Sequence, residues 1–293
     1  IFASLCRVMP PAPRVFPVLV MLIALPRVPF ADERTWDEHM KAARAAGKEG
    51  RCAAMEEETR KALAEAEAFG PRDLRTAKTL ENLAGILHTK GDLSQAEELH
   101  RRALKIKEGV PGSEMRVALT LHNLAGVHKD QKRHAQALAE LKRSIKYCRR
   151  GGTEGRHRLP AALASLGHLY EDMGRLKDSE RELLAALKLL DENPQDALKA
   201  SVLMSLASVH EGQGRNAEAE KRYREGIDLG KKAYGEDHPK FATDLEYYAD
   251  FLKKTDRPEP ARMMMESVAR MRAKHRAEGK TCPGEVVFQS GTP

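Results

Sequence analysis

Histidines are the first candidates for chemistry in this sequence, which has 11 of them among 293 residues, because imidazole ligates metals and transfers protons near neutral pH. No His-x-x-x-His occurs, the spacing that would place two ligands on one helix face, and there is no Cys-x-x-Cys. His128 and His210 fall at equivalent positions of an internal repeat, where Tyr170 and Leu252 stand in other copies. Because tyrosine and leucine can replace histidine at this position, we infer that the side chain there packs against other helices. We therefore expect no metal site and no cofactor.

Catalytic motifs are missing from the sequence. It has no Gly-x-x-x-x-Gly-Lys-Ser/Thr, no Gly-x-Ser-x-Gly and no His-Glu-x-x-His. The carboxylates are interspersed with lysines and arginines, where pairing at helical i, i+4 spacing explains them. We therefore expect that the protein is not an enzyme.

The net charge of +7 directs attention to basic clusters. The densest is residues 142–150, with Arg156 and Arg158 close behind. Such a stretch could contact the phosphates of nucleic acid or of an anionic lipid surface. The other interpretation is a solvated convex helix end followed by a mobile loop, and no aromatic residues are interleaved for base stacking. A basic-surface binder stays open as an alternative function, with nucleic acid not the expected partner.

The amino terminus has the layout of a secretory signal. Residues 15–25 form an apolar run too short to span a bilayer, Arg14 precedes it, and the small residue Ala31 follows. We expect residues 1–31 to be a signal-peptide-like or disordered leader and the protein to be exported to the periplasm or secreted, the alternative being a cytoplasmic protein. No later apolar run is long enough to predict a membrane span after the leader, and residues 280–293 are expected to be a flexible tail.

An internal repeat organises the rest of the chain. Five segments share the pattern Leu-x-x-Leu/Tyr-small, and their final small residues recur every 40–42 residues. Seven residues after the small residue comes a glycine in three copies, and twelve residues after it another small residue. The small residues that end the five segments are Ala84, Ala125, Gly167, Ala207 and Ala249.

The spacing within each copy predicts a helical hairpin. Leu80, Leu83 and Leu87 fall on one face of a first helix, and Gly91 ends it where the backbone needs positive φ. Ala96 and Ala103 then let a second helix approach the first closely. One hairpin cannot bury its own apolar face, so hairpins must stack as an all-α solenoid. Counting a degenerate first unit, we expect an array over residues 32–279 with units at about 34–73, 74–115, 116–156, 157–197, 198–238 and 239–279.

Three segments carry a family resemblance. Residues 79–84 (Thr-Leu-Glu-Asn-Leu-Ala), 95–99 (Gln-Ala-Glu-Glu-Leu) and 234–239 (Tyr-Gly-Glu-Asp-His-Pro) resemble the tetratricopeptide repeat (TPR) family. The usual repeat of that family is about 34 residues, and the longer period here is similar to the kinesin-light-chain subclass. The resemblance implies a right-handed α-solenoid, the TPR superhelix, whose extra residues fall between units, as at 149–160.

The resemblance also implies a concave groove lined by the first helices. The subclass has an asparagine in this groove, and it matches at Asn82 and Asn123 but is replaced by Ser165, Ser205 and Tyr247 in later copies. An amide could hold an extended peptide backbone, or the asparagines could only bond neighbouring helices. The implied partner-binding residues are Asn82, His88, His122, Asn123, Lys129, His168, Glu171, Ser205, Glu211 and Lys253.

These observations favour a non-catalytic protein–protein interaction scaffold. Its partner would be a protein or peptide segment held in the concave groove. Two alternatives remain from the sequence, namely the basic-surface binder and a structural self-assembly module that joins copies through its end repeats.

Overall fold

The computed structural model describes residues 33–277, and these residues form helices and turns without a β-strand. The expected leader at 1–31 and the expected tail at 280–293 lie outside the described residues. No helix within the described part is long and apolar enough to cross a membrane. Residues 33–277 form twelve helices: α1 (Glu33–Lys48), α2 (Cys52–Glu67), α3 (Leu74–Thr89), α4 (Leu93–Glu108), α5 (Glu114–Asp130), α6 (His134–Arg150), α7 (Gly152–Asp172), α8 (Leu176–Glu192), α9 (Asp196–Gly212), α10 (Asn216–Tyr234), α11 (Pro239–Lys254) and α12 (Pro258–Ala277).

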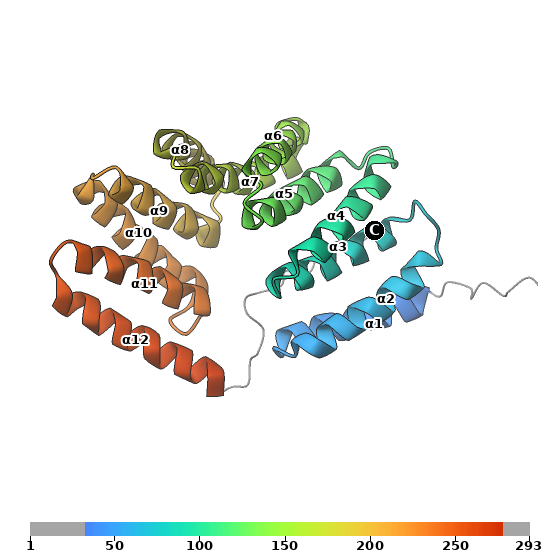
Figure 1. The fold of residues 1–293 in the computed structure, drawn as a ribbon, viewed down its shortest axis with the longest axis horizontal. Helices are drawn as coiled ribbons and strands as arrows, with labels where there is room; N and C mark the ends of the chain where they lie inside the picture. The colour runs from blue at the N-terminus through green and yellow to red at the C-terminus, as the bar shows by residue number, and fades with distance from the viewer. Residues whose placement is uncertain (1–32, 278–293) are drawn as a thin grey trace, which may run out of the picture. The chain divides into compact units, whose positions relative to one another are not determined.

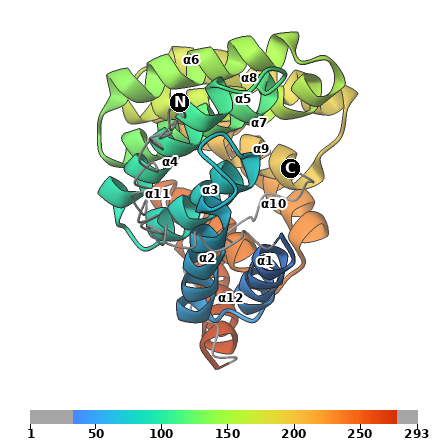
Figure 2. The same ribbon diagram turned by 90° about the vertical axis from the view of Figure 1, so that its right-hand side faces the viewer.

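Consecutive helices pack as hairpins, and the hairpins stack in chain order. Each odd-numbered helix pairs with the helix that follows it, as α1 with α2 and α5 with α6 show (Figure 1 and Figure 2). The second helix of one hairpin packs on the first helix of the next, and the first helices α3, α5, α7 and α9 also contact one another in series. The fold is therefore an α-solenoid, in which neighbouring first helices form a continuous wall.

The small residues of the repeat lie where the two helices of a hairpin meet. Ala84, Ala125, Ala207 and Ala249 are each at most 1% exposed, and their partners Ala96, Ala137 and Ala219 are fully buried. Large leucines surround them, so the hairpin interior is apolar and tightly closed. The sequence prediction for these positions is confirmed.

The turn between the helices of each hairpin needs positive φ at one residue. That residue is Gly91 in the α3–α4 turn, with φ of +85°, and Gly214 in the α9–α10 turn, with φ of +75°. Lys132 and Asp256 occupy the same position in two other turns, with φ of 62° and 59°. The backbone is thus the same in all copies, and two of them place a side chain where glycine is favoured.

The connection between α6 and α7 differs from the sequence prediction of a loop. Helix α7 begins at Gly152, directly after α6 ends at Arg150, and Pro160 lies inside it. A side chain at Gly155 would place its Cβ 2.0 Å from the Cys148 carbonyl oxygen, so only glycine allows this close approach. Arg156 and Arg158 therefore lie on a helix, where the Arg158 guanidinium pairs with Glu154 at 3.0 Å.

Candidate functional site

The wall of first helices encloses a cavity of about 360 Å³ between α3, α5 and α7. We call it the Asn123 cavity. Gly85 and Gly126 line it beside the two asparagines. Six of the ten predicted partner-binding residues line it: Asn82, His88, His122, Asn123, Lys129 and His168.

The remaining predicted residues lie elsewhere. Glu171 and Ser205 line a larger hollow, bounded mainly by α9, α11, α12 and the turn between α10 and α11, which we call the Asp244 hollow. Glu211 lines neither space, and it accepts hydrogen bonds from the Tyr223 hydroxyl at 2.9 Å and the Lys254 ammonium at 2.7 Å. Lys253 is exposed and also lines neither space.

Most predicted groove residues bond to the first helix of a neighbouring repeat. Nε2 of His88 lies 2.7 Å from an Asp130 oxygen, Nε2 of His122 lies 3.3 Å from the Ser165 hydroxyl, and Nε2 of His168 lies 2.6 Å from the Ser205 hydroxyl. Further along the wall, the Ser208 hydroxyl donates to Glu171 at 2.6 Å. Sequence reasoning considered this role only for the asparagines. The available signal was polar pairs separated by about one repeat, from 37 to 43 residues.

The two asparagines differ in their surroundings. Asn82 is only 3% exposed, whereas Asn123 is half-buried. Within residues 33–277 the side chain of Asn123 makes no hydrogen bond, so its amide donor and acceptor face the cavity. A half-buried amide without protein partners is well suited to bond a peptide backbone.

Burial favours the neutral form of three imidazoles that line the cavity, those of His100, His122 and His168. Burial lowers the pKa of His100 to about 3, with the nearby charges of His88 and Lys107 acting in the same direction. Burial also lowers the pKa of His168 to about 4 and lowers the pKa of His122. Each neutral imidazole offers one donor and one acceptor, so these three rings give the cavity polar groups without adding charge.

His100 is a lining residue that sequence reasoning missed. It comes from α4, a second helix, and lines the cavity together with residues of α3 and α5. Its side chain is 2% exposed, and within the described residues its Nδ1 atom has no hydrogen-bond partner. A buried ring nitrogen without a partner is costly, and a ligand in the cavity could supply that partner.

No three histidine, cysteine, aspartate or glutamate side chains between residues 33 and 277 gather as a ligand set. His88, His122 and His168 instead bond hydroxyls and a carboxylate of adjacent helices.

The basic stretch lies on the exposed side of α6. Lys142, Lys146, Arg149 and Arg150 are exposed, and none forms an ion pair within the part of the chain that the structure describes. Arg143 differs, because its guanidinium pairs with Glu108 at 3.0 Å.

Comparison with known proteins agrees with this architecture. The tetratricopeptide repeat family matches residues 37–109, 116–192 and 198–274. No curated protein shows a significant sequence match.

Solved structures with the same fold are distant in sequence. BtubC (BKLC) from P. vanneervenii is 15% identical, with 83% of this chain and 92% of that chain covered and a TM-score of 0.57. A putative kinesin light chain from Podosopora anserina is 15% identical, covering 69% and 98%, with a TM-score of 0.57. The Rap conjugation gene regulator of plasmid pLS20, solved in complex with the Phr* peptide, is 14% identical, covering 83% and 76%, with a TM-score of 0.63.

Proposed function

This chain belongs to the tetratricopeptide repeat family, and we propose that it is a non-catalytic scaffold that binds an extended peptide segment of another protein. The segment would lie along the inner face of α3, α5 and α7. The observation that carries this proposal is the half-buried Asn123 amide, which faces a cavity and makes no hydrogen bond within the described residues.

The chemistry of the Asn123 cavity supports a peptide backbone as the ligand. A backbone presents one N–H and one C=O per residue, and a carboxamide can bond both. The His100 Nδ1 atom adds a further polar group that lacks a partner within residues 33–277. The Rap regulator that shares the fold was solved with a peptide, which supports this class of ligand.

The inter-repeat bonds give the groove its rigidity. His88, His122 and His168 each link two first helices, so the wall is held in position before a ligand arrives. A preorganised groove loses less entropy on binding, which strengthens association. These histidines support binding mainly by fixing the wall.

Selection from a random dodecapeptide display library, with the full chain as the target, tests the proposal. We expect peptides to be enriched and Asn123→Ala to weaken their binding about 5–10-fold, which corresponds to the loss of one or two hydrogen bonds. Asn216→Ala is the matched control, because Asn216 is exposed on α10 away from the cavity. If no peptide is enriched, or if Asn123→Ala and Asn216→Ala lose the same amount of peptide affinity, the groove site is contradicted.

A second candidate function is binding of an anionic surface by α6. The four exposed cations without ion pairs support it. Charge reversal at Arg149 and Arg150 should then abolish binding to a polyanion such as heparin, and wild-type binding should fall steeply with salt. Binding that persists unchanged in either experiment would exclude this surface.

A further inference from the structure

One buried position between neighbouring repeats holds different side chains along the array. It is formed by a first helix, the second helix of the same hairpin, and the first helix of the next hairpin. Between the repeats of α3–α4 and α5–α6 the three residues are Glu81, Lys107 and Thr120, each at most 3% exposed. The Lys107 ammonium and the Thr120 hydroxyl both donate to the Glu81 carboxylate. At this junction a buried acid therefore has a complete set of partners.

The equivalent residues between the repeats of α9–α10 and α11–α12 are Met204, Gly230 and Asp244. Asp244 is a carboxylate with 5% of its surface exposed, and its Oδ2 atom has no hydrogen-bond partner within the described residues. A Cβ built on Gly230 would lie 3.4 Å from this oxygen. Glycine thus stands where the other junction supplies a lysine, and within the described residues Asp244 forms no ion pair with a cation.

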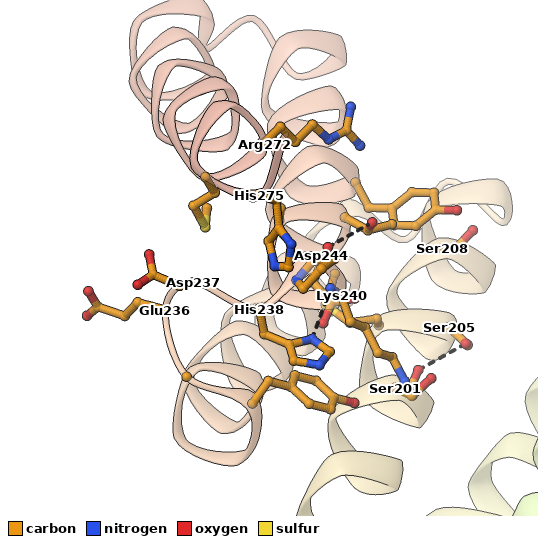
Figure 3. A pocket seen from close by; sticks show the side chains of 18 of the residues that line it. Ser201, Ser205, Ser208, Glu236, Asp237, His238, Lys240, Asp244, Arg272 and His275 are labelled. Carbon is orange, nitrogen blue, oxygen red and sulfur yellow. Dashed lines mark hydrogen bonds between the residues drawn. The ribbon is translucent and has the colours of Figure 1, made fainter. Parts of the chain in front are cut away.

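Asp244 opens onto the hollow that carries its name. Figure 3 shows it on α11 with Lys240, opposite Ser201, Ser205 and Ser208 of α9. Tyr247 lies one turn further along α11, lines the same hollow, and is 57% exposed. A carboxylate beside an accessible aromatic ring is a combination that attracts organic cations.

Three of the basic residues that line the hollow contact groups other than Asp244. Arg272 pairs with Glu246 at 2.5 Å, and Lys274 pairs with Asp237 at 2.5 Å. The Lys240 ammonium lies 5.1 Å from the centre of the Tyr234 ring. Burial raises the pKa of Asp244 to about 6, and Lys240 opposes that rise only in part. At neutral pH the carboxylate is therefore largely ionised, at a cost in stability that a bound cation would reduce.

We propose that Asp244 receives a lysine or arginine side chain of the bound segment, with Tyr247 stacking against it. This inference rests on the proposed function, and it adds a charge preference at the carboxyl-terminal end of the groove. The incoming cation would take the part that Lys107 plays beside Glu81, since a buried carboxylate is best satisfied by a hydrogen-bonded cation. The segment would thus be held by amide chemistry near Asn123 and by charge near Asp244.

A small probe tests the cation site without any peptide. Nα-acetyl-lysine N-methylamide carries the lysine side chain, and Nα-acetyl-norleucine N-methylamide is its uncharged match. In full-length protein labelled with ¹³C-aspartate, with Asp244→Asn used to assign the signal, we expect the lysine probe to lower the pKa of Asp244 by about one unit, equivalent to tenfold preference for the ionised form. The norleucine probe should leave it unchanged. Equal effects of both probes, or no effect of the lysine probe, would overturn the proposal.

Peptide selection then separates this inference from the proposed function. Wild type should enrich dodecapeptides with a lysine or arginine at a fixed position, whereas Asp244→Asn should still enrich peptides but without that preference. Lys240→Met should keep the preference for basic peptides, because the proposed cation comes from the peptide and not from Lys240. If this variant loses the preference, Lys240 is the cation that acts on Asp244, and the proposal is overturned. Enriched peptides without a basic preference in wild type would refute the cation site alone. If the lysine probe binds and no peptide is enriched, the groove proposal fails and the cation site stands.

Discussion

Two junctions between neighbouring repeats place equivalent positions of the repeat side by side. The side chains buried at these positions differ in polarity. Between α3–α4 and α5–α6, Glu81 accepts from Lys107 and Thr120, and we call this junction closed because the chain itself supplies the counter-ion. Between α9–α10 and α11–α12, Asp244 faces Gly230 and an open hollow. If Asp244 receives a cation of the partner as proposed, a solenoid can use one structural position either to join repeats or to recognise a partner. The choice depends on whether the chain itself supplies the counter-ion.

The largest effect is expected from breaking the closed junction. Lys107→Met removes the cation and leaves the Glu81 carboxylate buried and unpaired, so the free energy of unfolding should fall by about 3–5 kcal/mol. Chemical denaturation followed by circular dichroism measures this. The control is Lys107→Met combined with Glu81→Met, which copies Met204 of the other junction. It should recover most of the loss, since replacing both charges with apolar groups removes the penalty. If Lys107→Met alone is as stable as wild type, the pair of Glu81 and Lys107 does not stabilise this junction.

Asp244→Asn should change the free energy of unfolding in the opposite direction and stabilise the protein. The folded pKa of Asp244 is raised from 3.8 to about 6, so its contribution to stability is fully present below pH 3.8 and is lost as the pH rises through 6. At pH 7 the variant should therefore be more stable than wild type by roughly 3 kcal/mol, from about 1.4 kcal/mol per pKa unit. The advantage should shrink towards zero near pH 4. Denaturation curves at pH 4, 5, 6 and 7 test this, and a gain that does not depend on pH would contradict it.

Sequence reasoning reached the fold because its signals are local. The buried alanines, the glycine turns and the repeat period follow from helix geometry alone, and the all-α solenoid and its family are confirmed. It did not foresee that His88 or His168 would bond the next repeat, because those partners are set by how hairpins stack. Asp244 was missed for the same reason: a carboxylate on a predicted helix is ordinary until its neighbours are known to be Gly230 and Met204. The groove role of Asn123 stays a prediction.

The outer edges of the two junctions are alike, and this similarity can be tested too. Glu97 accepts from Arg133 at 2.5 Å in the closed junction, and Glu220 accepts from Arg257 at 2.8 Å in the open one. Burial alone would raise the pKa of Glu97, but the hydrogen bonds from His128, Gln131, Arg101 and Arg133 hold it at about 2. The contribution of the ionised Glu97 carboxylate to stability is therefore present above pH 4.5 and is lost as the pH falls through 2.

Glu97→Gln should lower the free energy of unfolding by about 1.5 kcal/mol at pH 7, the value of a hydrogen bond to a charged group. The difference from wild type should narrow between pH 4.5 and pH 2, where wild type loses its advantage. Thermal unfolding at pH 7 and at pH 3 provides the measurement. Glu98→Gln, an exposed neighbour on the same helix, is the control and should change little at either pH. A constant difference across this range would show that the Glu97 charge is not the source of the stability.

The smallest effect is expected at the turns within hairpins. Lys132 in the α5–α6 turn and Gly214 in the α9–α10 turn occupy one structural position, with φ of 62° and 75°. A side chain in this left-handed region costs about 1 kcal/mol, while glycine loses part of that advantage through the greater freedom of its unfolded chain. Lys132→Gly should therefore stabilise the array by about 0.5 kcal/mol, and Gly214→Lys should destabilise it by a similar amount. Lys132→Ala keeps the strained backbone and should give no gain. If Lys132→Ala stabilises as much as Lys132→Gly, the lysine side chain and not its φ is the cause, and the turns of the two regions are not equivalent.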